Sequence, residues 1–99
     1  MEAADDPVVQ GHRERITEAD LAILAAVNRR IALVDSLHRH KRGQGYATLD
    51  AGREQRLLGH LQEANRGPIS EEALERLYRL LLELCTAEAA RLSAEEANA

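Results

Sequence analysis

A chain of 99 residues is enough for one domain, near the lower limit for a core that is stable alone. Hydrophobic residues make up 44% of it, but it has no Phe, no Trp and only two Tyr, so its apolar volume is Leu, Ile, Val and Ala. That composition favours packed helices over strands. The single cysteine excludes an internal disulfide, and the net charge of −4 argues against a nucleic-acid partner.

The charge and hydropathy patterns also bear on localisation. Residues 1–10 are acidic and lack a basic flank followed by an apolar run, so we expect no signal peptide. No stretch approaches the roughly 18 apolar residues of a membrane span. We therefore expect a cytoplasmic protein with no membrane partner. The basic middle of the acidic chain, residues 12–56, suits a small anionic ligand.

The longest predicted helix covers residues 13–41, where neither Gly nor Pro interrupts an apolar pattern with steps of three and four. Asp6-Pro7 would allow an earlier start. The basic residues and glycines of segment 42–45 predict its end. The predicted inner face comprises Ile16, Asp20, Ile23, Val27, Arg30, Val34, Leu37 and Lys41.

Two shorter helices are predicted after it. The first covers residues 49–64 and ends at the Gly67-Pro68 break, and the second begins after Ser70, a good N-cap with acidic residues in the following turn. We expect the polar tail from Ser93 to fray. The chain is therefore predicted to be a single domain, 1–99, with flexible ends at about 1–11 and 93–99. The predicted inner faces are Arg53, Leu57, Leu58 and Leu61, and then Leu74, Leu77, Tyr78, Leu81, Leu82, Leu84 and Cys85.

The length of the first helix predicts a homodimer. Residues 13–41 would measure about 43 Å as an α-helix. A compact chain of this size has a radius of gyration of only about 13 Å. The apolar stripe of the long helix therefore extends past any core that the two shorter helices supply, and a two-fold pairing of long helices would cover it.

Charged residues occupy positions of the stripe where Leu or Val would be expected. Arg30 and Lys41 are eleven residues apart, which places them on one helix face about 16 Å apart. Asp50, Arg53 and Glu54 follow at the start of the second helix. Buried charges are costly unless paired, so this set suggests an anion site. In a purely structural interpretation, Arg30 pairs with a carboxylate and the Lys41 amine reaches solvent at the helix end.

The spacing of these residues resembles the all-helical (type II) chorismate mutases. The resemblance runs from about residue 13 to residue 91. It rests on Arg13-Glu14-Arg15-Ile16 with Asp20 seven beyond Arg13, on Arg30 and Lys41, and on the Asp50-Ala51-Gly52-Arg53-Glu54 segment, which matches an Asp-x-x-Arg-Glu signature. It implies an all-α fold of one long and two shorter helices in an intertwined homodimer. It also implies the rearrangement of chorismate to prephenate in aromatic amino-acid biosynthesis, without metal or cofactor.

The resemblance also implies roles for individual residues. Arg30 and Arg53, with Arg13 from the other subunit, would hold the two carboxylates of chorismate. Asp50 and Glu54 would hold the ring hydroxyl. Lys41 would donate to the ether oxygen, where negative charge develops as the carbon–oxygen bond breaks.

The third helix departs from the family pattern. The family has a small hydroxyl residue there and a Gln or Glu four residues later, and alignment of the apolar positions places Cys85 and Ala89 at these two sites. Alanine cannot donate a hydrogen bond. Glu88 is adjacent but about 100° around the helix, so it would serve only with a register shifted by one.

Other polar residues favour simpler interpretations. His38 and His40 point about 200° apart on a helix, which argues against a shared metal ion. Cys85 lies on an apolar face and is expected to be a small core residue. The basic segment 38–42 fits the end of a helix and lacks the aromatic neighbours of a nucleic-acid site.

Three functions remain compatible with the sequence. The first is chorismate mutase. The second keeps the fold but acts on a related substrate, as a 4-amino-4-deoxychorismate mutase or an isochorismate pyruvate lyase. The third is a non-catalytic helical dimerisation module in which the polar stripe residues set register. Asp50 and Glu54 favour a mutase over the lyase, because they suit a hydroxyl or an ammonium group on ring carbon four.

Overall fold

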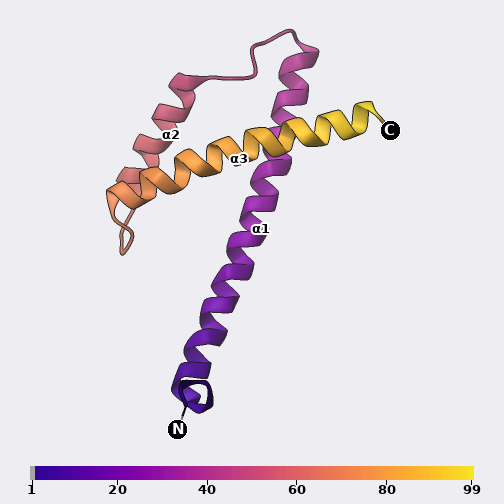
Figure 1. Ribbon diagram of the computed structural model, residues 1–99. Coiled ribbons are helices and arrows are strands. Elements are labelled where there is room, and N and C mark those ends of the chain that lie inside the picture. Colours follow the sequence, from indigo (N-terminus) through magenta and orange to yellow (C-terminus); the bar gives the residue numbers. More distant parts are fainter. Residues whose placement is uncertain (1) are drawn as a thin grey trace. The chain divides into compact units, whose positions relative to one another are not determined.

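The computed structural model describes residues 2–99 as helices joined by short connections (Figure 1). A short 3-10 turn, η1 (Ala3–Asp5), precedes three α-helices: α1 (Pro7–Gly43), α2 (Ala51–Ala64) and α3 (Glu71–Ala97). The described residues include no strand, so the predicted all-α class with one long and two shorter helices is confirmed. No helix within these residues has the length and apolarity needed to cross a membrane.

The chain divides into two units, residues 1–30 and residues 31–99, and α1 continues from the first into the second. In the first unit, α1 begins at Pro7, the earlier of the two starts that the sequence allows. Asp6 caps it, because its Oδ1 accepts from the backbone N–H of Val8 at 2.9 Å and its carbonyl accepts from that of Gln10 at 3.0 Å. Proline suits the first helical position, where an N–H would lack a partner.

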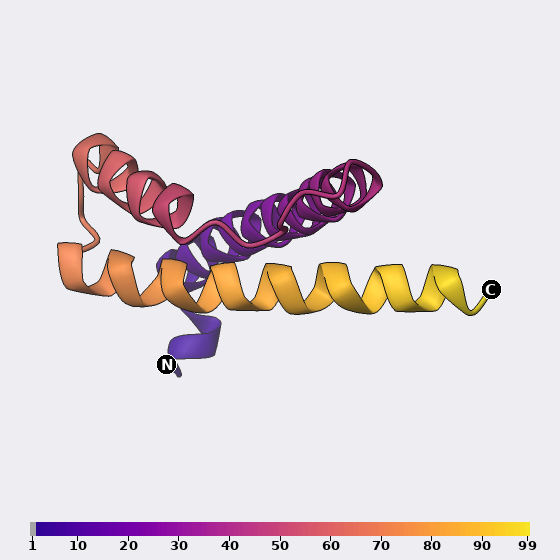
Figure 2. The ribbon, with the colours of Figure 1, turned by 90° about the horizontal axis from the view of Figure 1, so that it is seen from above.

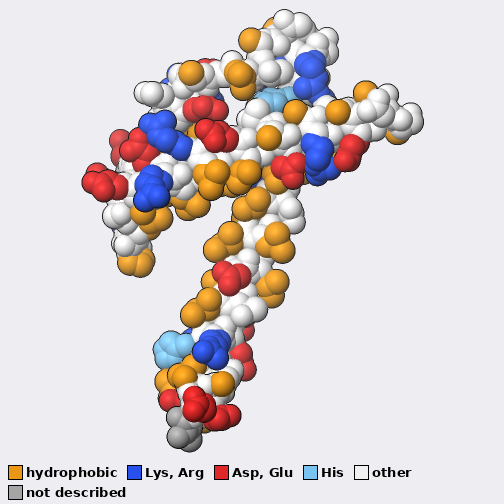
Figure 3. All heavy atoms as spheres, viewed as in Figure 1, with side chains coloured by type: hydrophobic (Ala, Val, Ile, Leu, Met, Phe, Trp, Pro, Cys, Tyr) orange, Lys and Arg blue, Asp and Glu red, His pale blue; other side chains and the backbone are white. Residues whose placement is uncertain are grey.

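This first unit has no core of its own. The structure places no buried residue in α1, and five large apolar side chains of the unit are between 56% and 66% exposed. Figure 3 shows such side chains in orange along α1. The five are Val8, Ile16, Leu21, Ile23 and Leu24.

The second unit opens with the last turns of α1, which end where the sequence predicts. Gly45 has φ +76°, a conformation that suits glycine. That turn lets the N–H of Tyr46 donate to the carbonyl of Lys41 at 2.8 Å and the N–H of Gly45 to that of Arg42 at 3.1 Å. The last carbonyls of α1 are thereby satisfied, and the chain leaves the helix toward α2.

Both shorter helices begin at side-chain caps. Asp50 Oδ1 accepts from the backbone N–H of Arg53 at 2.9 Å, and Ser70 Oγ accepts from that of Ala73 at 3.2 Å. Between α2 and α3, Asn65 holds the connection by donating to the carbonyl of Ile69 at 2.8 Å. Figures 1 and 2 both show α2 beside the N-terminal half of α3. All three α-helix starts and the C-terminal end of α1 therefore follow from local cap residues.

The buried side chains of the second unit lie along one stripe of α3. Leu74 is 8% exposed, Ala89 1% and Cys85 fully buried. Their spacing of 11 and 4 residues is that of a single helix face. From α2, Leu57, Leu58 and Leu61 are half-buried, as the sequence predicts, whereas Arg53 is exposed.

The predicted inner faces of α1 and α3 were wrong at three positions. Leu37, Leu77 and Leu84, assigned to inner faces, are 48% to 50% exposed, and Asp35 and His38 are half-buried on α1 instead. The segment from Ser93 onward belongs to α3, which continues to Ala97, and the expected fraying of this tail stays a prediction. Side-chain contacts between this tail and the end of α1 are described below.

Candidate functional site

The two arginines of the first unit lie on the same helix, far apart. Arg13 is exposed and Arg30 is half-buried. They are 17 residues apart in α1, which corresponds to about 25 Å along the axis. An extended arginine side chain reaches only about 7 Å from its Cα. Arg13 and Arg30 of one chain therefore cannot hold the same small molecule.

Lys41 lies in the last turn of α1 and is half-buried. Its Nζ donates to the carbonyl oxygen of Thr48 at 3.3 Å, in the connection between α1 and α2. An ammonium group has three donors, so this contact leaves capacity for a ligand. The α1–α2 connection thus holds the amine near the end of α1 without using all its hydrogen-bonding capacity.

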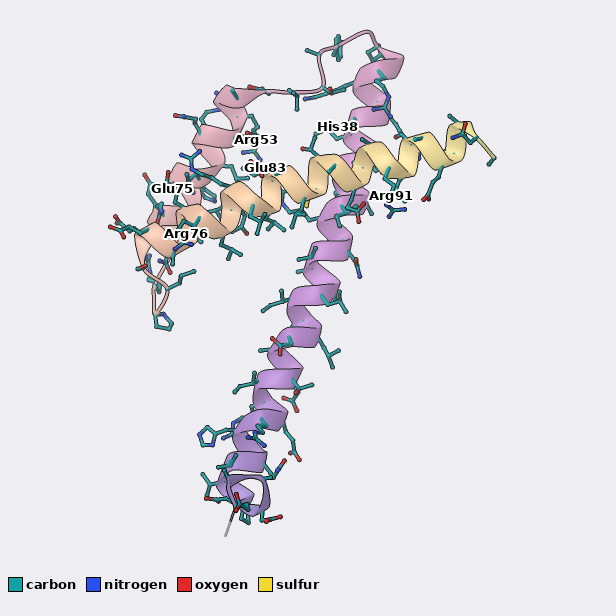
Figure 4. All side chains as sticks on the ribbon, in the orientation of Figure 1. His38, Arg53, Glu75, Arg76, Glu83 and Arg91 are labelled. Carbon is teal, nitrogen blue, oxygen red and sulfur yellow. The ribbon has the colours of Figure 1, made fainter. Side chains whose placement is uncertain are left out.

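His38 lies on α1 one turn before Lys41 and is half-buried (Figure 4). Burial lowers the pKa of His38, and the positive charges of Lys41 and Arg42 lower it further, against the carboxylate of Asp35, which raises it. The neutral imidazole is therefore favoured in the folded chain.

The acidic and basic residues at the start of α2 have distinct surroundings. Asp50 is committed to the helix cap through Oδ1, and its Oδ2 lies 4.0 Å from Arg56 Nη2. Arg53 has an exposed side chain, which Figure 4 labels on α2. Glu54 lies in the first turn of α2, where the negative charge of a carboxylate interacts favourably with the positive end of the helix dipole.

A groove of about 850 Å³ lies between α2 and α3. Among the candidate residues that the structure describes, Glu54 lines it, beside apolar side chains such as Leu58, Tyr78 and Leu82. Lys41 and Arg53 are not among the residues that line it. The Lys41 and Arg53 side chains therefore do not border the groove, although Leu49, the residue after Thr48, does.

The third-helix candidates differ sharply in burial. Cys85 is a free thiol, fully buried, and Ala89 is 1% exposed on the same stripe. Glu88 points elsewhere: its side chain is 43% exposed, and its Oε2 accepts from Arg91 Nε at 2.7 Å. Figure 4 shows Arg91 on α3. Of the two positions that the sequence left open, Ala89 is the one on the buried face of α3.

One group of contacts has no counterpart in the sequence analysis. Ser93 of α3 contacts Asp35 and Arg42 of α1, and Glu96 contacts Arg39. We refer to Asp35, Arg39, Arg42, Ser93 and Glu96 as the Ser93 cluster. The spacing of Asp35, Arg39 and Arg42, and that of Ser93 with Glu96, was a signal that two polar helix faces could meet. No group of three or more His, Cys, Asp or Glu side chains within residues 2–99 is arranged to hold a metal ion.

Comparison with known proteins bears on all the candidate site residues together. The sequence profile of the family described as chorismate mutase type II matches residues 12–89, most of the chain and parts of both units. The chain belongs to the chorismate mutase type II family. No curated protein gives a significant match. The resemblance that the sequence predicts is thereby confirmed at the level of the family.

The chorismate mutase type II match has definite limits along the chain. It includes every candidate residue from Arg13 to Glu88 and ends at Ala89. The α3 residues of the Ser93 cluster lie beyond it.

Proposed function

We propose that the protein is a chorismate mutase, which converts chorismate to prephenate without metal or cofactor. The observation that carries this proposal is the family match over residues 12–89, a span that contains all the candidate ligand-binding residues. In the reaction the ether carbon–oxygen bond breaks as a new carbon–carbon bond forms within the same molecule. No atom enters or leaves, so a protein accelerates it by holding a reactive conformer and by stabilising the separated charge.

The arginines would bind the two carboxylates of the substrate. Guanidinium groups suit this role, because they remain charged and bind carboxylates through two parallel hydrogen bonds. We assign Arg30 and Arg53 to one chain and Arg13 to its partner. The separation of about 25 Å along α1 supports that assignment, since Arg13 cannot share a ligand with Arg30 of its own chain.

The remaining candidates would act on the ring and on the breaking bond. Lys41 would donate to the ether oxygen, where negative charge grows in the transition state. Glu54 would accept from the ring hydroxyl, as would Asp50, whose side chain already caps α2. The hydrogen bond from Lys41 to the Thr48 carbonyl supports this role, because it restrains the amine and leaves two donors.

We further propose an intertwined homodimer. The exposed apolar side chains of residues 1–30 support it, because most of the stability of a helix in a protein comes from packing of its apolar face. Burial of a Leu, Ile or Val side chain contributes about 1.5–3 kcal/mol. Because the five side chains are 56% to 66% exposed, burying the rest of them would contribute about 5–9 kcal/mol, comparable with the whole stability of a small domain. A second copy of α1 would supply that burial in both chains at once.

A turnover assay with three substrates tests the proposal. The purified protein is incubated with chorismate, isochorismate and 4-amino-4-deoxychorismate, and prephenate, salicylate plus pyruvate, and the amino analogue of prephenate are measured. We expect chorismate to give the highest kcat/KM. Preference for the amino analogue would favour the second candidate, which the two carboxylates Asp50 and Glu54 support. Pyruvate release from isochorismate would indicate the lyase. Absence of turnover with all three substrates would favour the non-catalytic dimerisation module.

The buried position of Ala89 leads to a prediction about rate. If Ala89 stands where the family has a Gln or Glu, Ala89→Gln should raise kcat for chorismate, because an amide donor near the ether oxygen favours the transition state. The measurement is steady-state kinetics of the variant. Ala89→Leu is the matched control, since it adds similar volume to this buried site without a donor.

Glu88→Gln distinguishes the alternative register. Because Glu88 is paired with Arg91, we expect this variant to keep the kcat and the pH profile of the wild type. If Glu88 is the donor instead, it must be protonated, so wild-type activity would fall as the pH rises and Glu88→Gln would flatten that dependence.

A further inference from the structure

The Ser93 cluster joins two helices at positions far apart in the sequence. Ser93 Oγ donates to Asp35 Oδ1 at 3.1 Å and accepts from Arg42 Nη2 at 2.8 Å. A hydroxyl has one proton to donate and lone pairs to accept, so both capacities are used. Arg39 Nε donates to both oxygens of the same aspartate, at 2.9 and 3.0 Å, and Arg39 also pairs with Glu96.

The cluster requires an ionised aspartate, and its surroundings favour one. The hydrogen bond from Arg39 lowers the pKa of Asp35, while its burial raises it; Ser93 and the charges of Arg39 and Arg42 lower it further. The Asp35 side chain is 16% exposed, so the contacts are partly shielded from water. At neutral pH the carboxylate is therefore an acceptor for the serine and for Arg39 together.

Each half of the cluster lies on the same helix as a proposed site residue. On α1, Asp35, Arg39 and Arg42 follow one stripe. Lys41 lies in the same last turn as Arg42 and donates to the Thr48 carbonyl. On α3, Ser93 is four residues after Ala89 and eight after Cys85, which continues the buried stripe. The contacts with Ser93 therefore fix the last turns of α1 against a defined turn of α3.

We infer that the Ser93 cluster positions Lys41 relative to Cys85 and Ala89, so that Ser93 is a positioning residue for the reaction. This inference rests on the proposed function, in which Lys41 donates to the ether oxygen. Ser93 does not touch the substrate: it acts through the orientation of α1. The family match ends at Ala89, so the α3 half of the cluster lies outside the matched segment.

Two variants of Ser93 test the inference. Ser93→Ala removes the donor and the acceptor while keeping α3 intact, because alanine is a better helix former than serine. We expect kcat for chorismate to fall about 10-fold to 100-fold with KM within twofold, as for a small misplacement of a catalytic group. Ser93→Thr keeps the hydroxyl and should restore most of the loss. Ser36→Ala, an exposed serine of α1, is the matched control and should keep wild-type kcat.

Hydrogen exchange supplies a readout that does not depend on turnover. In Ser93→Ala the amides of Gln44, Gly45 and Tyr46, which close the end of α1, should exchange about 10-fold faster than in the wild type, while thermal unfolding stays unchanged. Unchanged kcat together with unchanged exchange would overturn the inference, as would a loss of kcat that Ser93→Thr does not repair. If the wild type turns over none of the three substrates, the proposed function fails. Faster exchange would in that case still show that Ser93 holds the end of α1, whereas its role in the reaction would be overturned.

Discussion

Lys41→Met is expected to lower kcat for chorismate by a factor of about 10² to 10³, or about 3–4 kcal/mol, with a smaller change in KM. Methionine keeps the length and the apolar stem of the side chain but removes the donor to the breaking ether bond. The loss falls on kcat because the charge on that oxygen develops only in the transition state. Steady-state kinetics of the variant and the wild type measure it.

Arg76→Met provides the matched control for this loss. Arg76 is an exposed cation of α3, which Figure 4 labels, and the same replacement there should leave kcat unchanged. A Lys41→Met enzyme within a factor of a few of the wild type would mean that Lys41 only holds the α1–α2 connection through the Thr48 carbonyl.

Mixing two inactive variants is expected to restore activity. If Arg13 completes the site of the partner chain, Arg13→Ala and Arg30→Ala each lose one carboxylate ligand at both sites and most of their activity. After subunit exchange, about half of the dimers contain one chain of each kind. In those dimers one site has both arginines and the other has neither, so the mixture should recover about a quarter of the wild-type activity per chain.

A second mixture controls for nonspecific recovery. Arg30→Ala and Arg53→Ala remove ligands that we assign to the same chain, so every site of their mixed dimers lacks one arginine and activity should stay low. Light scattering should give twice the chain mass of 11.0 kDa for each protein. A monomeric mass, or failure of the first mixture to recover activity after exchange, would contradict a shared site.

Local sequence features determined the helices of this protein. Asp6-Pro7, Asp50 and Ser70 start them, and each acts through a cap that depends on neighbours two to four residues away. Gly45 ends α1 for the same local reason, since its positive φ lets the next N–H groups reach the last carbonyls. Such interactions form within one turn of chain, so they can be predicted without knowledge of the fold.

The candidate site residues were predicted from their spacing along the sequence and not from local caps. The offsets of Lys41 and of the segment 50–54 from Arg30 carried the family resemblance, and the family match includes all of them. The roles of these residues stay predictions. Helix periodicity added that Cys85 and Ala89 share a face, and in the folded chain that face is buried.

Tertiary structure alone decided which polar residues of α1 face α3. The helical period of 3.6 residues predicts Leu37 on the inner face of α1. Leu37 is instead 50% exposed, whereas the polar residues Asp35 and His38 are partly buried. The contacts of Ser93 with Asp35 and Arg42 span 58 and 51 residues of sequence. No local pattern specifies a pairing over that distance, because it depends on the turn of α3 that meets the end of α1. For the same reason the interaction partners of the polar tail from Ser93, which is helical to Ala97, could not be predicted: they come from another helix.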